Sequence, residues 1–185
     1  DWEEGEIRYT QSLDAQPLHL AYSPQGSYVV VSEATFRSMR IFDARSGREE
    51  EFLQRGFGIV SFFAVAQSEA RIMTYSATSG EIIYWDLQSG FEIQRSDSEP
   101  GLEHMRLFGN RRYAAGVRNR TLYLVDVLGG QAVDSINLGA NPRDLVIEAD
   151  GESVSLLVAE ASGELVLQSY ALRNGRLNRR YSTTY

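Results

Sequence analysis

The sequence has 185 residues, of which 43% are hydrophobic and 23% charged, which is typical of soluble globular proteins with a full core. It contains no cysteine, which excludes disulfides and thiolate metal sites, and its net charge of −7 argues against nucleic acids or anionic membranes as partners. No apolar run is long enough to span a bilayer, so we expect no direct membrane insertion. All 18 basic residues are arginine, which we interpret as the bias of a high-GC bacterial genome, with cytoplasm and periplasm both left open.

Short apolar runs separated by turn residues follow one another along the chain, and each predicts a β-strand. The pattern is clearest at the two ends, where the runs 18–24 and 144–149 lead through Gln25-Gly26 and Asp150-Gly151 into 27–32 and 154–159. Glycine in these pairs tolerates the positive φ of a tight hairpin turn. The corresponding strands of the middle repeats are predicted at 59–66, 72–76, 104–108 and 113–117.

A second motif recurs after each pair of strands: an apolar run, usually an aspartate, a short link and a glycine. The anchoring glycines are separated by 43, 40 and 45 residues; they are Gly47, Gly90, Gly130 and Gly175. A period of about 40–45 residues built of short strands is typical of propeller blades. We therefore predict an all-β fold, a β-propeller with four recognisable four-stranded blades.

The predicted blades cover residues 16–56, 57–98, 99–139 and 140–185, and residues 6–13 are predicted to form the outer strand of a preceding blade. Five outer strands then accompany four inner sets, so we expect this segment to belong to a larger ring of six to eight blades. The segment starts acidic and its last strand is basic, which predicts a seam between blades or subunits. The residues of this predicted seam are Glu3, Glu4, Glu6, Arg176, Arg179 and Arg180.

The repeats resemble WD40 repeats in the stretch Ala21-Tyr22-Ser23-Pro24-Gln25-Gly26 and in Tyr84-Trp85-Asp86. They also resemble YVTN, or lactonase-like, propellers in Gly139-Ala140-Asn141-Pro142-Arg143, which leads into Asp150-Gly151. The Gly-His pair of WD40 repeats is absent, and Trp-Asp occurs in one repeat of four. Both resemblances imply a ring of six to eight blades, and the second implies arginine, histidine and carboxylate groups converging at a channel mouth.

The sequence contains no nucleophile elbow, phosphate loop or metalloprotease motif, so we predict no catalytic residue, metal or cofactor. His19 and His104 lie near the starts of inner strands, where we interpret them as hydrogen-bonded structural residues. Arg118, Asn119 and Arg120 are predicted as binding residues that hold a carboxylate or phosphate, unless they only blunt a strand edge.

Phe36 is predicted as an exposed aromatic contact in a hairpin turn. These features favour a non-enzymatic protein–protein interaction or scaffold module of a bacterial assembly, with protein partners or further blades of the same ring. The alternative is a lactonase-like or other channel-mouth enzyme with catalytic residues partly outside this segment. Trp85 is predicted to be buried within its blade.

Overall fold

The computed structural model describes residues 7–23, 25–33, 39–50, 60–65, 71–86 and 89–184. Within these ranges the chain forms strands and no helix, so the described residues include no helix that could cross a membrane. The strands of the first half are β1 (Pro17–Tyr22), β2 (Tyr28–Glu33), β3 (Met39–Asp43), β4 (Phe62–Val65), β5 (Arg71–Tyr75), β6 (Glu81–Asp86) and β7 (Glu92–Asp97). Those of the second half are β8 (Glu103–Leu107), β9 (Tyr113–Arg118), β10 (Thr121–Asp126), β11 (Ala132–Asn137), β12 (Pro142–Ile147), β13 (Ser153–Ala159), β14 (Leu165–Arg173) and β15 (Arg176–Thr184).

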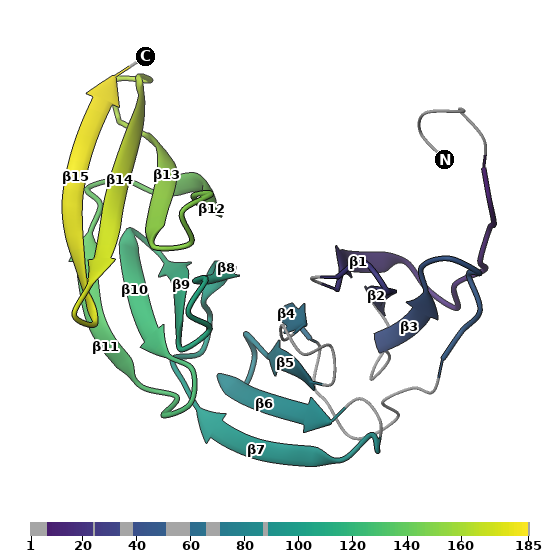
Figure 1. Cartoon of the computed structure of the whole chain (residues 1–185). Helices are drawn as coiled ribbons and strands as arrows, with labels where there is room; N and C mark the ends of the chain where they lie inside the picture. The colour runs from purple at the N-terminus through teal and green to yellow at the C-terminus, as the bar shows by residue number, and fades with distance from the viewer. Residues whose placement is uncertain are drawn as a thin grey trace. The chain divides into compact units, whose positions relative to one another are not determined.

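The strands form four sheets in chain order, β1–β3, β4–β7, β8–β11 and β12–β15, and within each sheet neighbouring strands are consecutive in the chain (Figure 1). The chain thus forms four blades of an all-β, β-propeller fold, which confirms the predicted fold class. The chain also divides into two compact units, one from residues 1–76 and 83–95 and the other from 77–82 and 96–185. Each unit is described below by itself.

The inner strands of the blades lie where the sequence pattern predicts them, with ends that differ by a few residues. Two of the expected outer strands are described only in part. The described residues 7–13 of the predicted first strand pair with no strand of the described chain. Only the isolated bridge between Phe42 and Glu49 marks the outer strand expected after β3, because residues 51–59 lie outside the described ranges.

The recurring aspartate and glycine close the turn after the third strand of a blade. In the first three repeats the aspartate carbonyl accepts a hydrogen bond from the glycine N–H, and its carboxylate accepts bonds from N–H groups inside the turn. The glycines adopt φ of 69–73°, a left-handed conformation that favours glycine. The paired residues are Asp43 with Gly47, Asp86 with Gly90, and Asp126 with Gly130.

The fourth repeat replaces this turn by a two-residue hairpin. Asn174 and Gly175 join β14 to β15 with φ of 52° and 70°, and Arg173 pairs directly with Arg176. Two positive φ values in a two-residue loop match the twist of the flanking strands. The repeat therefore needs no capping aspartate, and Ala171 occupies that position.

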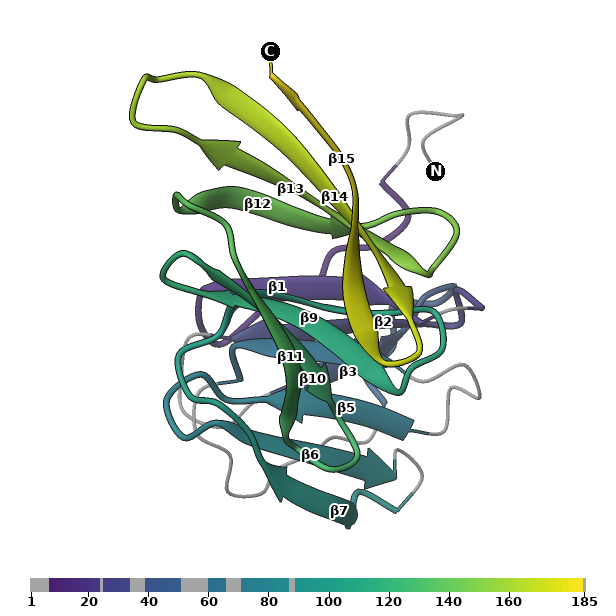
Figure 2. The same ribbon diagram turned by 90° about the vertical axis from the view of Figure 1, so that its left-hand side faces the viewer.

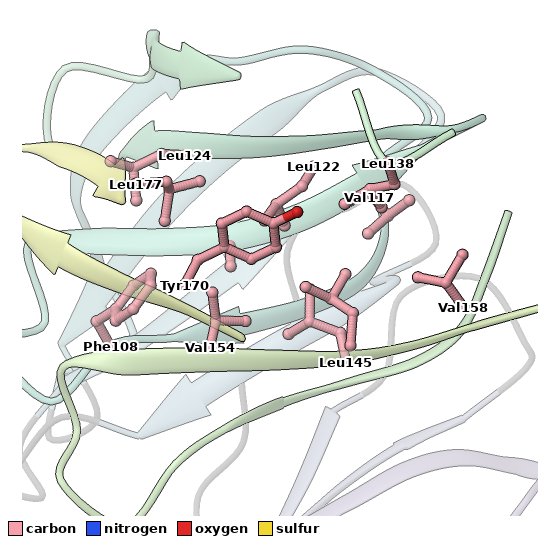
Figure 3. Packing of buried hydrophobic residues seen from close by; sticks show 12 residues of the cluster. Phe108, Val117, Leu122, Leu124, Leu138, Leu145, Val154, Val158, Tyr170 and Leu177 are labelled. Atoms are coloured by element: carbon pink, nitrogen blue, oxygen red, sulfur yellow. The ribbon is translucent and has the colours of Figure 1, made fainter. Parts of the chain in front are cut away.

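The core of the second unit lies between the sheets β8–β11 and β12–β15. Figure 3 shows Tyr170 of β14 among aliphatic side chains from both sheets, and all members of this cluster are buried. The cluster consists of Phe108, Ala115, Val117, Leu122, Leu124 and Leu138 on the first sheet and Leu145, Val154, Leu156, Val158, Tyr170 and Leu177 on the second. In Figure 2 the side of the molecule that carries β14 and β15 faces the viewer.

The core of the first unit includes Trp85, which is 4% exposed and confirms the predicted burial. Its indole Nε1 donates a hydrogen bond of 3.1 Å to Thr74 Oγ1. Thr74 Oγ1 in turn donates to the carbonyl of Ile83 at 3.4 Å. The polar atom of the largest side chain in this core is thus satisfied by the neighbouring strand.

Candidate functional site

The predicted binding residues Arg118, Asn119 and Arg120 lie on the tight connection between β9 and β10. Asn119 adopts a φ of 56°, which asparagine tolerates better than most residues. Arg118 forms an ion pair with Glu99 at 2.9 Å and a hydrogen bond to Tyr123 Oη at 3.2 Å. These contacts raise the pKa of Arg118, with the hydrogen bond to Tyr123 as the largest cause. The guanidinium of Arg118 is therefore already engaged within its own blade.

Arg120 lies instead at an open hollow with a volume of about 510 Å³. Its walls come from the β9–β10 connection, the loop between β11 and β12, the first residues of β12 and the turn after β13. The polar side chains in this wall are those of Arg120, Asn141, Arg143 and Glu160. Arg143 is the extra residue where the β12–β13 register shifts, between the pairs Pro142–Val158 and Asp144–Leu157.

His104 lies on the inner strand β8, at a residue where the strand is irregular. Its φ of 51° coincides with a register shift between β8 and β9. The His104 Nδ1 atom is 3.8 Å from Asp144 Oδ1 on β12, and both side chains are partly exposed. No group of three or more histidine, aspartate or glutamate side chains within the described ranges is arranged to hold a metal ion.

The predicted seam residues of the C-terminal strand all lie on β15. Arg180 is the extra residue at a β14–β15 register shift, and its Nη1 donates to Glu148 Oε2 and to Ser153 Oγ, each at 2.9 Å. Arg176 and Arg179 are exposed. Their predicted counterparts Glu3, Glu4 and Glu6, and the predicted contact Phe36, lie outside the described residues, so the seam stays a prediction.

Arg180 is part of a polar network on the face of the β12–β15 sheet that points away from the core. Glu148 Oε1 accepts hydrogen bonds from Ser155 Oγ at 2.6 Å and Ser169 Oγ at 2.7 Å. The hydroxyls of Ser155 and then Ser169 are the main causes that lower the pKa of Glu148, with Arg180 adding to the effect. Ser155 and Ser169 are 7% and 0% exposed. This network keeps a carboxylate charged on a sheet face.

The same positions in the preceding blade carry apolar side chains. The hairpin hydrogen bonds and strand registers align Phe108 with Glu148, Ala115 with Ser155 and Leu124 with Ser169. In the third blade these side chains are buried against the fourth. The outward face of the fourth blade is therefore chemically unlike the face that the third blade offers to its neighbour.

On the first blade, by contrast, one face of the sheet exposes apolar side chains of β1. The register pairs Leu20 with Val31 and Tyr22 with Val29, as Leu145 pairs with Leu156 and Ile147 with Val154 in the fourth blade. Leu20 is thus the equivalent of Leu145. Leu145 is fully buried by the third blade, whereas Leu20 and Tyr22 are each 63% exposed.

The N-terminal segment covers the rest of this face. Val29, Val31 and Phe42 are buried, and Leu13 packs against them. Tyr9 Oη donates to the carbonyl of Ala44 at 3.0 Å, and Gln11 Nε2 donates to that of Gly47 at 2.7 Å. Among the described residues of this face, Leu20 and Tyr22 of β1 are thus large apolar side chains that stay exposed.

Sequence reasoning missed Leu20, Tyr22, Arg143 and Glu148 as residues of interest. Leu20 and Tyr22 read as ordinary apolar strand residues, and nothing in the sequence shows what lies opposite them. Glu148 could have been noticed from the sequence, because a charged residue there replaces the apolar Phe108 of the third repeat. Arg143 was seen only as part of a family resemblance.

Comparison with known proteins agrees with this architecture. A curated Treponema pallidum (strain Nichols) protein, described as an uncharacterized protein, is 25% identical over 130 residues, which are 70% of this chain. The chain spans about a fifth of that relative's length.

Among solved structures, Kuenenia stuttgartiensis hydrazine synthase superposes with a TM-score of 0.72 at 18% identity, over 96% of this chain and 53% of that one. A chain of the mitotic checkpoint complex superposes with a TM-score of 0.64 at 10% identity, over 89% of this chain and 52% of that one. At such identities the likeness establishes the fold alone.

The family model described as an N-terminal beta-propeller domain (TP_0598_N) matches residues 1–141. The match covers the first three blades in full and most of the chain. The chain therefore belongs to this family of N-terminal beta-propeller domains.

Proposed function

We propose that this chain is a non-enzymatic protein-interaction module. A further propeller blade packs against the face of its first blade, over Leu20 and Tyr22 of β1. The observation that carries the proposal is the difference between equivalent residues: Leu145 is fully buried by the neighbouring blade, whereas Leu20 is 63% exposed. Complete burial of an exposed leucine is worth roughly 1.5–3 kcal/mol, so covering the exposed part of Leu20 favours association by a share of that, and the ring of Tyr22 adds to it. A propeller blade is the occupant that the repeat geometry supports.

The N-terminal segment supports the same proposal. A Cβ atom added to Gly130 would overlap the carbonyl oxygen of Asp97, the last residue of the preceding outer strand β7. A Cβ atom added to the equivalent Gly47 would overlap the ring of Tyr9. The segment around Tyr9 thus contacts the first blade where an outer strand contacts the blade after it.

This equivalence supports the proposed layout, in which residues 6–13 are the outer strand of a preceding blade and the four blades follow at 16–56, 57–98, 99–139 and 140–185. A strand forms only with a partner to pair with, and the inner strands of that preceding blade would supply it. On this proposal the ring contains more than four blades, and its repeats are divergent members of the WD40 or YVTN type within a bacterial assembly.

The test uses the absence of cysteine from this chain. Leu20→Cys and, as a matched control, Leu128→Cys are introduced singly into the full-length protein; Leu128 is 51% exposed in the turn after β10. The rate of maleimide modification is then measured peptide by peptide. We expect the thiol at position 20 to react at least about tenfold more slowly than the control, because a covering blade excludes the reagent. Equal rates would contradict the proposal.

A further inference from the structure

The hollow beside Arg120 gathers hydrogen-bond donors without partners. Among the described residues, no side chain forms a hydrogen bond or ion pair with Arg120, Asn141 or Arg143, and all three are exposed. Within the same unit, Arg118 is paired with Glu99 and Arg180 with Glu148. Arg120 and Arg143 stand together on one wall, and no carboxylate of the described chain is bound to either guanidinium.

Backbone hydrogen bonds and strand pairing hold the three segments that carry these residues in place. The carbonyl of Arg120 accepts a hydrogen bond from the Leu138 N–H at 2.8 Å, which ties the β9–β10 connection to the loop that carries Asn141. That loop is capped where Asn137 Oδ1 accepts from the Gly139 N–H at 2.8 Å. Arg143 follows at the register shift of β12, so it is not committed to the sheet's pairing pattern. The backbone positions from which the three side chains extend are therefore fixed before a ligand binds.

We propose that this hollow binds a carboxylate of an acidic peptide segment from a partner protein. A guanidinium presents parallel N–H groups that match the two oxygens of a carboxylate, and an asparagine amide adds a further donor. The open volume of about 510 Å³ accommodates side chains of a peptide. Glu160 at the same wall is the one carboxylate there, and it opposes anion binding by like charge.

This surface is formed by the third and fourth blades, whereas the proposed blade contact is on β1 of the first. The two proposals concern different surfaces, so each can be tested without the other. It also assigns to Arg120 and Arg143, rather than to the engaged Arg118, the capture of the anion.

The experiment measures fluorescence anisotropy of a fluorescein-labelled peptide of six glutamates with the full-length protein at low salt, about 50 mM, where screening is weak. We expect Arg120→Gln and Arg143→Gln each to weaken binding roughly tenfold, because each removes a bidentate, charge-assisted contact. Glu160→Gln should strengthen it. The matched control is Arg173→Gln, which changes the charge equally at an exposed arginine lining a different hollow.

Three outcomes would overturn the proposal. One is equal weakening by Arg173→Gln and Arg143→Gln, which would show attraction by net charge without a site. Another is undetectable binding at millimolar protein. The third is competition by sulfate as strong as by glutarate of the same charge, which would show that the hollow does not select a carboxylate. Circular dichroism of each variant confirms that it is folded.

Discussion

Replacing Trp85 tests the packing of the first unit at its largest buried side chain. The indole is 4% exposed, and its Nε1–H bonds to Thr74 Oγ1 at 3.1 Å. Trp85→Ala removes the whole ring and leaves a cavity, which costs about 3–5 kcal/mol in comparable cores. Trp85→Phe keeps most of the apolar volume and loses the hydrogen bond, for a smaller cost of about 1–2 kcal/mol.

Thr74→Val completes a double-mutant cycle. Valine matches the shape of threonine but leaves the indole N–H buried without its acceptor, which costs about 1–3 kcal/mol. Combined with Trp85→Phe, in which the N–H is absent, the same change should cost less, with a coupling of at least about 0.5 kcal/mol. Thr74 also donates to the Ile83 carbonyl, and that loss is common to both arms of the cycle.

The assay is urea denaturation followed by circular dichroism in the strand region, with the midpoint and slope fitted separately. An unchanged slope shows that the variants alter stability rather than the extent of unfolding. A loss below about 1 kcal/mol for Trp85→Ala would show that the indole contributes little to this core. Additive costs for Trp85→Phe and Thr74→Val would refute the hydrogen bond itself.

Three further outcomes are expected. Gly130→Ala should destabilise the protein by more than about 2 kcal/mol in urea melts, because a Cβ would overlap the Asp97 carbonyl oxygen at a φ of 73°. Gly139→Ala, at a φ of 81° with open space around it, should cost about 1 kcal/mol from backbone strain alone, and equal losses at the two sites would exclude the overlap as the cause. Glu148 has a pKa lowered by hydrogen bonds from Ser155 and a second serine, so its stabilising contribution is present above its ordinary pKa of 4.5 and is lost as the pH falls through the lower value in the folded protein. Unfolding midpoints measured from pH 6 to about pH 3 should thus fall less steeply for Glu148→Gln than for the parent, and parallel curves would contradict the linkage.

Most of the fold could be predicted because each blade repeats the same local chemistry. The Asp-to-Gly turns are encoded by residues that bond within a few positions of one another, such as Asp43 with Gly47. The fourth repeat departs at Ala171, and the structure shows why: its two-residue turn at Asn174 and Gly175 needs no cap. Local hydrogen bonds of this kind leave a trace in the sequence.

The candidate surfaces could not be predicted in the same way. Leu20 and Leu145 are the same residue type in the same register, and they differ only in what covers them. The hollow depends on Arg143 being an extra residue in β12, which is a property of strand pairing and not of composition. Arg120 was predicted as a binding residue, and its guanidinium has no side-chain partner among the described residues, which is compatible with that prediction. Arg118, in contrast, is bound to Glu99 and Tyr123.

The polar outward face of the fourth blade has a consequence for how copies of this protein associate with one another. A sheet that ends in an apolar face invites successive copies to stack head to tail without closing, which is the route to fibres. Here such stacking would place Leu20 of one copy against Glu148 and Arg180 of the next. The two charged side chains would then lose their hydration without gaining new hydrogen-bond partners. Association of copies by this route is therefore expected to be unfavourable at every step, because each contact would remove water from the Glu148–Arg180 pair.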